Sequence, residues 1–328
     1  MNAHNARKQS EIGKAQNMKL LHTSDWHIGQ QLFNFSRNDE HQHFLSQLAD
    51  IVEREKPDVM VVSGDVYHVS NPSAEAEQLF VDRLLEICSR NPKMRTLVTA
   101  GNHDSALRLE ADKALWKRNN VTISGVYQRD EENKLAPEKF VYKVEGVGIV
   151  AAVPYFNPRF ASYAETFAKI DKEVESLNTE NLPVVYMAHA SVGSAERYGT
   201  NETGIGGIDF IPLSDFGNQY DYLALGHIHK PMFIGGSDGH ARYCGSPIAI
   251  SFDEVHPHGV DILEIEHGQK PAIRTIPIAQ LRNVQTIPSE PKPFEEAIRL
   301  LEELPSECPD YIRLNVLVET HLDSKQDK

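Results

Sequence analysis

The sequence has few of the features that mark secreted or membrane-spanning proteins. Only three cysteines occur in 328 residues, and Cys88, Cys244 and Cys308 are too far apart for metal-ligand spacing. Neither a disulfide framework nor a cysteine-ligated zinc site is therefore expected. No run approaches the ~20 apolar residues needed to cross a bilayer, and residues 1–17 lack the apolar core of a secretory signal. The sequence predicts a cytoplasmic protein with reduced thiols and no membrane segment.

Basic charge is also scarce. The chain has 33 Lys and Arg against 47 Asp and Glu, which gives a formal net charge of −14 at pH 7. A protein that holds DNA through a field of Lys and Arg is strongly cationic, because neutralising phosphates supplies most of non-specific affinity. The composition excludes a simple basic clamp, so any DNA binding needs another source of positive charge. With 40% hydrophobic and 24% charged residues, the chain is otherwise typical of a globular protein.

The hydrophobic pattern divides the chain into three parts. We predict a disordered leader over residues 1–17, a large α/β domain over residues 18–280, and the start of a small α+β domain over residues 281–328. In the large domain, short β-branched runs alternate with amphipathic segments, as in βα units. After residue 222 the predicted strands follow one another closely, which favours antiparallel pairs. Residues 193–219 are rich in glycine and predict a long loop.

Histidines and acidic or amide side chains follow five of the predicted strands. In an open α/β sheet, ligands bind outside the carboxyl ends of the strands, so these side chains are expected to converge. One such group alone is weak evidence, but five together predict a metal site. The groups are Asp25 with His27, Asp65 with His68, Asn102 with His103 and Asp104, His189, and His227 with His229.

The ligand types narrow the choice of metal and of chemistry. Two carboxylates, an amide oxygen and four imidazoles form an oxygen and nitrogen set that suits Mn²⁺, Fe or Zn²⁺. Seven ligands are too many for one ion and suit two ions if one carboxylate bridges them. Two ions ~3.5 to 4 Å apart are the arrangement used for in-line displacement at phosphorus. The residues therefore predict phosphoester hydrolysis.

The order of these motifs resembles the signature of the calcineurin-like metallophosphoesterases. Longer matches are similar to the SbcD-type DNA nucleases, bacterial members of a family that includes the eukaryotic double-strand-break-repair nuclease. The resemblance covers about residues 18–280. The matching segments are HTSDWHIGQ at 22–30, GDVYH at 64–68, GNHDS at 101–105, GHIHKP at 226–231 and RYCGSPIAISFDE at 242–254.

The resemblance implies two metal ions, most readily Mn²⁺, and divides the seven ligands between them. One ion would be held by Asp25, His27, Asp65 and His229. The other would be held by Asp65, Asn102, His189 and His227, with Asp65 as the bridge.

The resemblance also implies roles for four residues that are not metal ligands. A metal-bridging hydroxide would attack phosphorus, and His103 would assist the departing 3′ oxygen, with Asp104 orienting the His103 ring. His68 would lie toward the substrate phosphate, although it could also be a simple surface histidine. Arg37, in the loop 30–38, is a candidate contact to the DNA backbone, with a solvated loop as the alternative.

Further expectations follow from the same resemblance. The fold would be a four-layer αββα sandwich of mixed sheets, followed by a small α+β capping domain. The activity would be that of a DNA phosphodiesterase in end processing, recombination, replication and repair: a 3′-to-5′ exonuclease on double strands and an endonuclease on single strands. Its DNA substrates would include double-stranded ends, single strands and hairpins.

Partners are implied in the same way. These would be an SbcC-type coiled-coil ATPase and a second copy of the chain, near the nucleoid in a bacterial cytoplasm. The homodimer contact would use the helices at 74–88 and 107–117, whose apolar faces could equally be plain core. Family members usually continue past a complete cap into a helical segment that docks on the ATPase. Because this sequence stops at Lys328, we expect an incomplete cap, an intact nuclease core and no stable SbcC complex.

Two other functions remain open from the sequence. One is a small-molecule phosphodiesterase or protein phosphatase on the same fold, although protein phosphatases typically carry Glu where this chain has Asp104. The other is a DNA-end-binding scaffold with a vestigial metal site, against which the complete ligand set argues.

The remaining histidines are predicted to have structural or surface positions. His22 is expected in the core, and His41 and His258 are expected at the surface.

Overall fold

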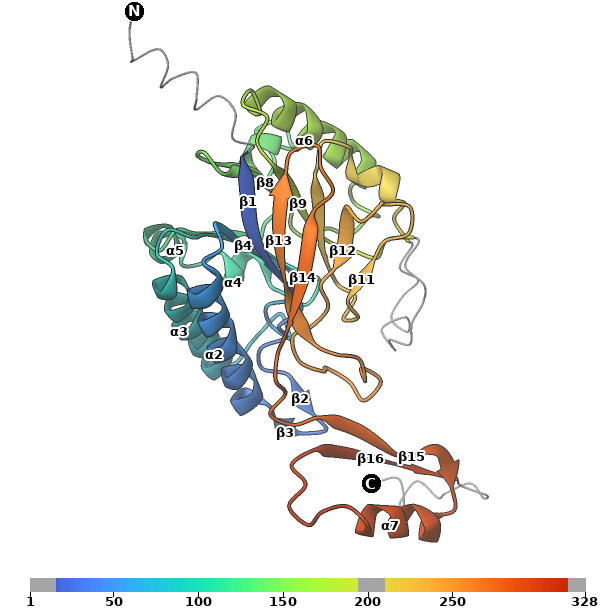
Figure 1. The fold of residues 1–328 in the computed structure, drawn as a ribbon. Helices are drawn as coiled ribbons and strands as arrows, with labels where there is room; N and C mark the ends of the chain where they lie inside the picture. The colour runs from blue at the N-terminus through green and yellow to red at the C-terminus, as the bar shows by residue number, and fades with distance from the viewer. Residues whose placement is uncertain (1–15, 194–209, 318–328) are drawn as a thin grey trace, which may run out of the picture.

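The computed structural model describes residues 16–193 and 210–317. Nearly all of the predicted leader and most of the predicted loop 193–219 lie outside the described residues. Two six-stranded sheets form the centre of the molecule (Figure 1). Among the helices described, none is long and apolar enough to span a bilayer.

The first sheet has the strand order β14-β13-β1-β4-β5-β6. Its β1, β4, β5 and β6 are parallel, and β13 and β14 run antiparallel to their neighbours. The carboxyl ends of β1, β4 and β5 therefore lie on one edge. The strands span Asn17–Thr23 (β1), Val59–Ser63 (β4), Arg95–Thr99 (β5), Val121–Ser124 (β6), Gly259–Glu266 (β13) and Ala272–Pro277 (β14).

The second sheet has the order β11-β12-β10-β9-β8-β7. Here β8, β9, β10 and β12 are parallel, with antiparallel β7 and β11 at the edges. The expected antiparallel pairs after residue 222 occur, but β10 and β12 are parallel neighbours. The strands span Val141–Val144 (β7), Gly148–Ala152 (β8), Val184–His189 (β9), Tyr222–Gly226 (β10), Met232–Phe233 (β11) and Ala241–Tyr243 (β12).

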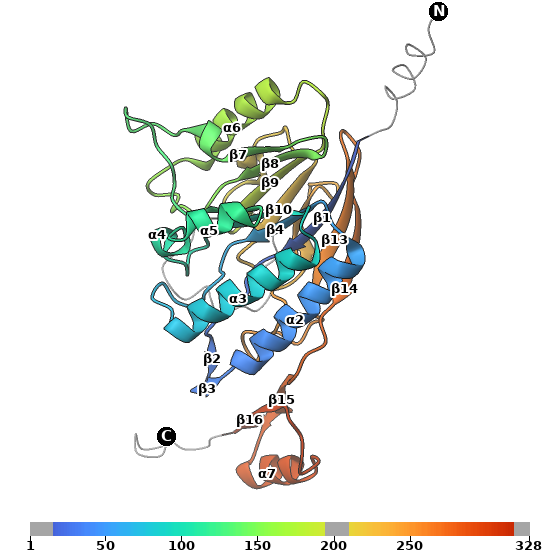
Figure 2. The ribbon, with the colours of Figure 1, turned by 90° about the vertical axis from the view of Figure 1, so that its left-hand side faces the viewer.

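Three hydrophobic layers hold the sheets and helices together. Between the sheets, side chains such as Leu20 and Val61 pack with Met187 and Ala224 from the opposite sheet. Helices α2 (Asn38–Glu55) and α3 (Ala74–Arg90) cover the outer face of the first sheet, and α6 (Tyr163–Leu177) covers the second (Figure 2). The predicted four-layer αββα fold is confirmed.

Local signals explain where these helices begin and end. Ser73 caps α3 by accepting a hydrogen bond from the N–H of Ala76, and Lys56 closes α2 in a left-handed conformation. The predicted helix over 107–117 is instead two short helices, α4 (Ala106–Leu109) and α5 (Lys113–Arg118). The chain breaks between them where the buried carboxylate of Glu110 accepts the N–H groups of Gly125 and Val126. Two 3-10 helices span Pro137–Lys139 (η1) and Leu213–Phe216 (η3).

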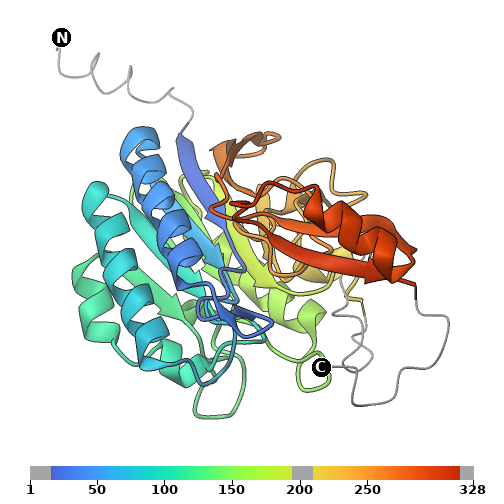
Figure 3. The same cartoon turned by 90° about the horizontal axis from the view of Figure 1, so that it is seen from below.

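The last described segment forms a small unit beyond the sandwich. Parallel strands β15 (Val284–Lys292) and β16 (Tyr311–Val316) are joined by α7 (Phe294–Glu302). Figure 3 shows this unit beside the hairpin of β2 (Gln31–Leu32) and β3 (Phe35–Ser36). The Tyr311 hydroxyl donates to Glu40 at 2.8 Å, and Arg313 pairs with Asp253 at 3.0 Å. These contacts tie the unit to the large domain.

Candidate metal centre

The ends of five strands bring the predicted ligands together. The loops after β1, β4 and β5 of the first sheet carry Asp25 and His27, Asp65, and Asn102. From the second sheet, β9 ends at His189 and β10 is followed at once by His227, with His229 two residues later. The site therefore lies where the carboxyl ends of parallel strands from both sheets meet.

Two groups of ligand atoms can be distinguished by distance. In the first, His27 Nε2 lies 3.1 Å from His229 Nε2, and Asp25 offers an oxygen within 4.8 Å of both. In the second, Asn102 Oδ1 lies 3.0 Å from His189 Nε2 and 3.0 Å from His227 Nδ1.

Asp65 lies between the two groups. Its Oδ2 is 3.7 Å from His27 Nε2 and 3.2 Å from His189 Nε2. The grouping matches the division of ligands expected for two ions, with Asp65 in the position of a bridge.

The hydrogen bonds around these rings show that the residues fit cations. Glu254 accepts from His229 Nδ1 at 2.9 Å, and the Ser63 carbonyl accepts from His189 Nδ1 at 2.9 Å. Each ring therefore carries its proton on Nδ1, and its Nε2 lone pair points into the centre. Lone pairs and carboxylates that face one another in a buried site repel unless positive charge lies between them. Two divalent ions held by these seven residues would supply that charge.

The pKa values of the centre describe its charge without metal. Burial lowers the pKa of His27 well below its usual value and that of His227 to about 3, so both imidazoles are neutral ligands. Burial also lowers the pKa of His189, but the charge and hydrogen bond of Asp65 outweigh it and raise the pKa to about 9. Metal binding must therefore release the proton on His189.

The two carboxylates of the centre differ in their environments. Burial raises the pKa of Asp25 to about 6. Burial acts in the same direction on Asp65, but the neighbouring His189 and His27 outweigh it and hold its pKa below the usual range. Asp65 therefore stays ionised between the two groups of ligands, as a bridging carboxylate requires.

Backbone strain is concentrated at the same residues. Asp25, His27, Asp65 and His227 adopt φ values of 54°, 46°, 49° and 98°. Non-glycine residues in this region cost free energy and are held there only by the surrounding structure. Four of the seven predicted ligands are strained in this way, which indicates that the chain is shaped by the geometry of the site.

Two glycines allow the ligand loops to approach each other. Gly64 has a φ of +86°, and a Cβ added there would meet the His189 ring. A Cβ at Gly101 would meet the carboxylate and the backbone N of Asp65. The glycines of the Gly-Asp and Gly-Asn-His-Asp motifs therefore make room for the residues of the neighbouring loops.

We expect Gly64→Ala to lower the free energy of unfolding more than Gly146→Ala. Both positions have positive φ, +86° and +69°, but nothing lies within 4 Å of a Cβ at Gly146. The control should lose about 1–2 kcal/mol from φ strain, and Gly64→Ala a further 1–3 kcal/mol, roughly, from overpacking against His189. Urea unfolding of both variants measures the difference; equal losses would contradict the close approach.

His103 and His68 lie beside the first group of ligands. His103 Nδ1 donates to the His68 carbonyl at 2.7 Å, and its ring meets the His27 ring edge-on at 4.9 Å. The His103 N–H donates to Asp65 Oδ1 at 2.9 Å, which ties it to the centre. The His68 ring stacks on the His103 ring at 5.6 Å. With Nδ1 engaged, Nε2 is the nitrogen that His103 can offer to a substrate.

Asp104 does not orient the His103 ring as predicted. Its carboxylate accepts three backbone N–H groups, from Gly101 at 2.8 Å, Tyr67 at 2.9 Å and Val66 at 3.1 Å. These bonds join the loop after β5 to the loop after β4. Asp104 therefore braces two ligand loops, and the carbonyl of His68 orients His103 in its place.

The predicted DNA contact of Arg37 is also corrected. Its side chain is 1% exposed, and its guanidinium is bound to Glu40, to Gln30 at 3.0 Å and to the carbonyl of Ala249. A buried guanidinium with these partners cannot reach a DNA backbone.

The surface positions expected for His41 and His258 are corrected as well. Both are buried, and both nitrogens of each ring are hydrogen-bonded to backbone carbonyls. The expected core position of His22 is confirmed, since it is 0% exposed.

Glu254 is a site residue for which the sequence reasoning assigned no role. It is 5% exposed. Burial raises its pKa, but the hydrogen bond and charge of His229 outweigh burial and lower the pKa to about 2. Its other oxygen, Oε2, accepts from Ile250 N at 3.0 Å and Ser246 at 3.2 Å. Metal-binding histidines usually donate their second N–H to such a carboxylate, so the acid at the end of RYCGSPIAISFDE could have been sought on that ground.

Glu254→Gln is expected to weaken Mn²⁺ binding by about 10- to 100-fold, as is typical when a carboxylate behind a metal-bound histidine is removed. The amide would no longer hold the proton of His229 on Nδ1 by charge. The Mn²⁺ dependence of bis(p-nitrophenyl) phosphate hydrolysis measures this affinity. Glu175→Gln, which alters an exposed acid on α6, is the matched control. An unchanged Mn²⁺ requirement in Glu254→Gln would refute the role.

Comparisons with known proteins agree with this geometry. Residues 18–231 match the family described as Calcineurin-like phosphoesterase. The SbcD subunit of the nuclease SbcCD from Rhodobacter capsulatus is 31% identical, with 88% of this chain and 76% of the relative covered. The protein of the same name from Escherichia coli K12 is 25% identical, with 95% and 81% covered. That of Bacillus subtilis is 30% identical, with 77% and 68% covered.

The family match spans the sequence from β1 to the loop that carries His229, and so includes all seven predicted ligands. The relatives extend the likeness over most of the chain. The chain belongs to the calcineurin-like phosphoesterase family, as a metal-dependent enzyme of its SbcD-type nuclease branch.

Proposed function

We propose that the protein is a two-metal, Mn²⁺-dependent DNA phosphodiesterase. The observation that carries the proposal is the arrangement of two groups of oxygen and nitrogen ligands around Asp65, with His103 beside them. When bound, two divalent ions would supply positive charge at the scissile phosphate and make water more acidic. They carry +4 against −2 from Asp25 and Asp65, which leaves the centre near +2 on a protein whose net charge is −14.

The protein residues divide the remaining work. His103 is proposed to hold a proton on Nε2 near the departing 3′ oxygen, because its Nδ1 proton is fixed by the His68 carbonyl. His68, stacked on that ring and partly exposed, is proposed to face the substrate phosphate. Asp104 and Glu254 do not touch substrate in this scheme; they position the ligand loops and the His229 ring.

The finer activity is proposed from the relatives and from the resemblance of the sequence motifs. It comprises 3′-to-5′ exonuclease action on double strands and endonuclease action on single strands, in DNA end processing, recombination and repair. Two relatives are named as the SbcD subunit of the SbcCD nuclease, and we propose an SbcC-type ATPase as partner together with a second copy of this chain. A bacterial enzyme of this kind works at the chromosome, so the proposal includes a cytoplasmic, nucleoid-associated location. We also propose that the domain boundary lies near residue 280.

A nuclease assay tests the proposed function. The full chain is incubated with blunt duplex DNA and with circular single-stranded DNA, in Mn²⁺, in Mg²⁺ and in EDTA. The proposal expects shortening of the duplex and opening of the circle in Mn²⁺, weaker cleavage in Mg²⁺ and none in EDTA. Absence of cleavage in every metal would refute a nuclease. A strong preference for p-nitrophenyl phosphate over bis(p-nitrophenyl) phosphate would instead favour a phosphomonoesterase.

A further inference from the structure

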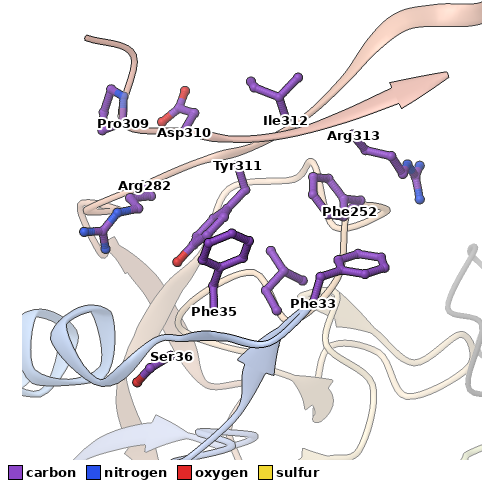
Figure 4. Close-up of a pocket in the computed structure, with 11 residues that line it drawn as sticks. Phe33, Phe35, Ser36, Phe252, Arg282, Pro309, Asp310, Tyr311, Ile312 and Arg313 are labelled. Atoms are coloured by element: carbon purple, nitrogen blue, oxygen red, sulfur yellow. The ribbon is translucent and has the colours of Figure 1, made fainter. Parts of the chain in front are cut away.

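A cavity outside the metal centre lies between the β2–β3 hairpin and the C-terminal unit (Figure 4). Its volume is about 690 Å³, which is within the range of ligand-binding pockets. Four aromatic side chains border it: Phe33 and Phe35 from the hairpin, Phe252 from the loop before Glu254, and Tyr311 from β16. None of these four belongs to the predicted metal site.

The two hairpin phenylalanines are unusually exposed. Phe33 is 74% exposed and Phe35 is 65% exposed. Each is paired with an aromatic ring across the cavity, Phe33 with Phe252 at 5.9 Å and Phe35 with Tyr311 at 6.3 Å, and both pairs are tilted by about 50°. Tilted pairs leave ring faces open to a planar ligand. Large apolar side chains exposed together around a cavity indicate a binding surface.

Arginines flank the aromatic rings on both sides (Figure 4). Arg282 pairs with Asp39 at 2.7 Å, and Arg313 pairs with Asp253 at 3.0 Å while lying over the Phe252 ring at 5.3 Å. Their side chains are 30% and 41% exposed. Ion pairs this exposed contribute little stability, so a phosphate can replace the carboxylate at low cost. Aromatic faces with guanidinium groups beside them are the combination that binds single-stranded nucleic acid.

The cavity is continuous with the metal centre along the chain. Phe33 follows His27 by six residues, and Phe252 precedes Glu254 by two. Glu254 in turn holds the ring of His229 at 2.9 Å. The loops that form two walls of the cavity are therefore the loops that carry or support predicted ligands. A DNA strand with one phosphodiester at the centre would bring neighbouring nucleotides to these walls.

We propose that this cavity binds an unpaired base of the DNA strand, stacked on Phe33 and Phe35, with neighbouring phosphates at Arg282 and Arg313. The inference rests on the proposed nuclease function and adds a preference for DNA with unpaired bases next to the cleaved bond. An apolar segment of a partner protein would use the rings but not the cations on both sides, so the flanking arginines favour the nucleic acid.

Fluorescence of 2-aminopurine tests the proposal without cleavage. A short single-stranded oligonucleotide carrying one 2-aminopurine is titrated with the full chain in EDTA, and stacking should quench the base. Phe33→Ala and Phe35→Ala are each expected to weaken binding roughly tenfold, the usual effect of losing one stacking ring. Phe33→Tyr should restore binding. Phe160→Ala, which alters a phenylalanine that is 83% exposed and does not line the cavity, should bind like the unaltered protein.

Three results would overturn the proposal: no quenching, equal affinity of the alanine variants, or an equal loss when the oligonucleotide is fully duplex. Thermal melting of each variant checks that it is folded, and Phe33→Tyr keeps the test decisive if an alanine variant is not. The proposed function fails separately, because it fails in the Mn²⁺ cleavage assay on the unaltered protein. Cleavage without quenching refutes the base site alone.

Discussion

Asp65→Asn is expected to lower Mn²⁺-dependent hydrolysis of bis(p-nitrophenyl) phosphate by well over about 100-fold. Removing a residue that only supports a metal ligand already costs about 10- to 100-fold, and Asp65 is shared by both ligand groups. Its Oδ2 is 3.2 Å from His189 Nε2 and 3.7 Å from His27 Nε2. Asparagine keeps the size of the side chain but removes the charge and can direct an N–H₂ group at lone pairs that should face metal.

The measurement combines turnover with metal content. The unaltered protein should bind two Mn²⁺ per chain, and Asp65→Asn should bind fewer and turn over slowly at saturating Mn²⁺. Asp50→Asn, which makes the same change at an exposed position on α2, should behave like the unaltered protein. Two bound ions and normal turnover in Asp65→Asn would show that Asp65 does not bridge.

The convergence of the predicted ligands could be foreseen from sequence for a simple physical reason. Each ligand follows a short buried strand within a few residues, and the ends of parallel strands share one edge of a sheet. Asp25, Asp65, Asn102 and His189 thus meet although they are as many as 164 residues apart, 189 − 25. Strand ends are determined locally by apolar runs and turn residues, and these are visible in a sequence.

The partners of individual side chains could not be foreseen in the same way. Asp104 is adjacent to His103 in sequence, yet it accepts backbone N–H groups from two other loops. Arg37 lies in a polar loop, yet its guanidinium is buried against Glu40 and Ala249. Which buried acceptor finds which donor depends on contacts between loops far apart in the chain. The role of Glu254 was missed for the same reason.

Strand β15 shows another limit of sequence patterns. Its segment contains Pro288 and Pro291, and proline removes a ladder donor and is confined to edges and bulges. The strand forms in a two-stranded sheet with β16, and its pairing shifts register between Ile287 and Lys292. A strand with only one partner can place its prolines away from the ladder, which the pattern alone did not reveal.

His103→Asn is expected to slow DNA cleavage by about 10²- to 10⁴-fold, the usual contribution of a positioned proton donor, while leaving Mn²⁺ content unchanged. His103 is not among the predicted ligands, and its backbone N–H, which donates to Asp65 at 2.9 Å, survives the substitution. The metal centre should therefore stay formed. What is lost is the ring held by the His68 carbonyl at 2.7 Å, with Nε2 facing the substrate.

The size of the loss should depend on the leaving group, and this dependence separates proton transfer from a structural role. A DNA 3′ oxygen is a poor leaving group and needs a proton, whereas p-nitrophenolate leaves readily as an anion. His103→Asn should therefore slow DNA cleavage far more than hydrolysis of bis(p-nitrophenyl) phosphate. His43→Asn, the same change at a partly buried histidine on α2, should slow neither. Equal losses on both substrates would mean that His103 shapes the site or binds phosphate, since a misplaced centre would slow every phosphodiester alike.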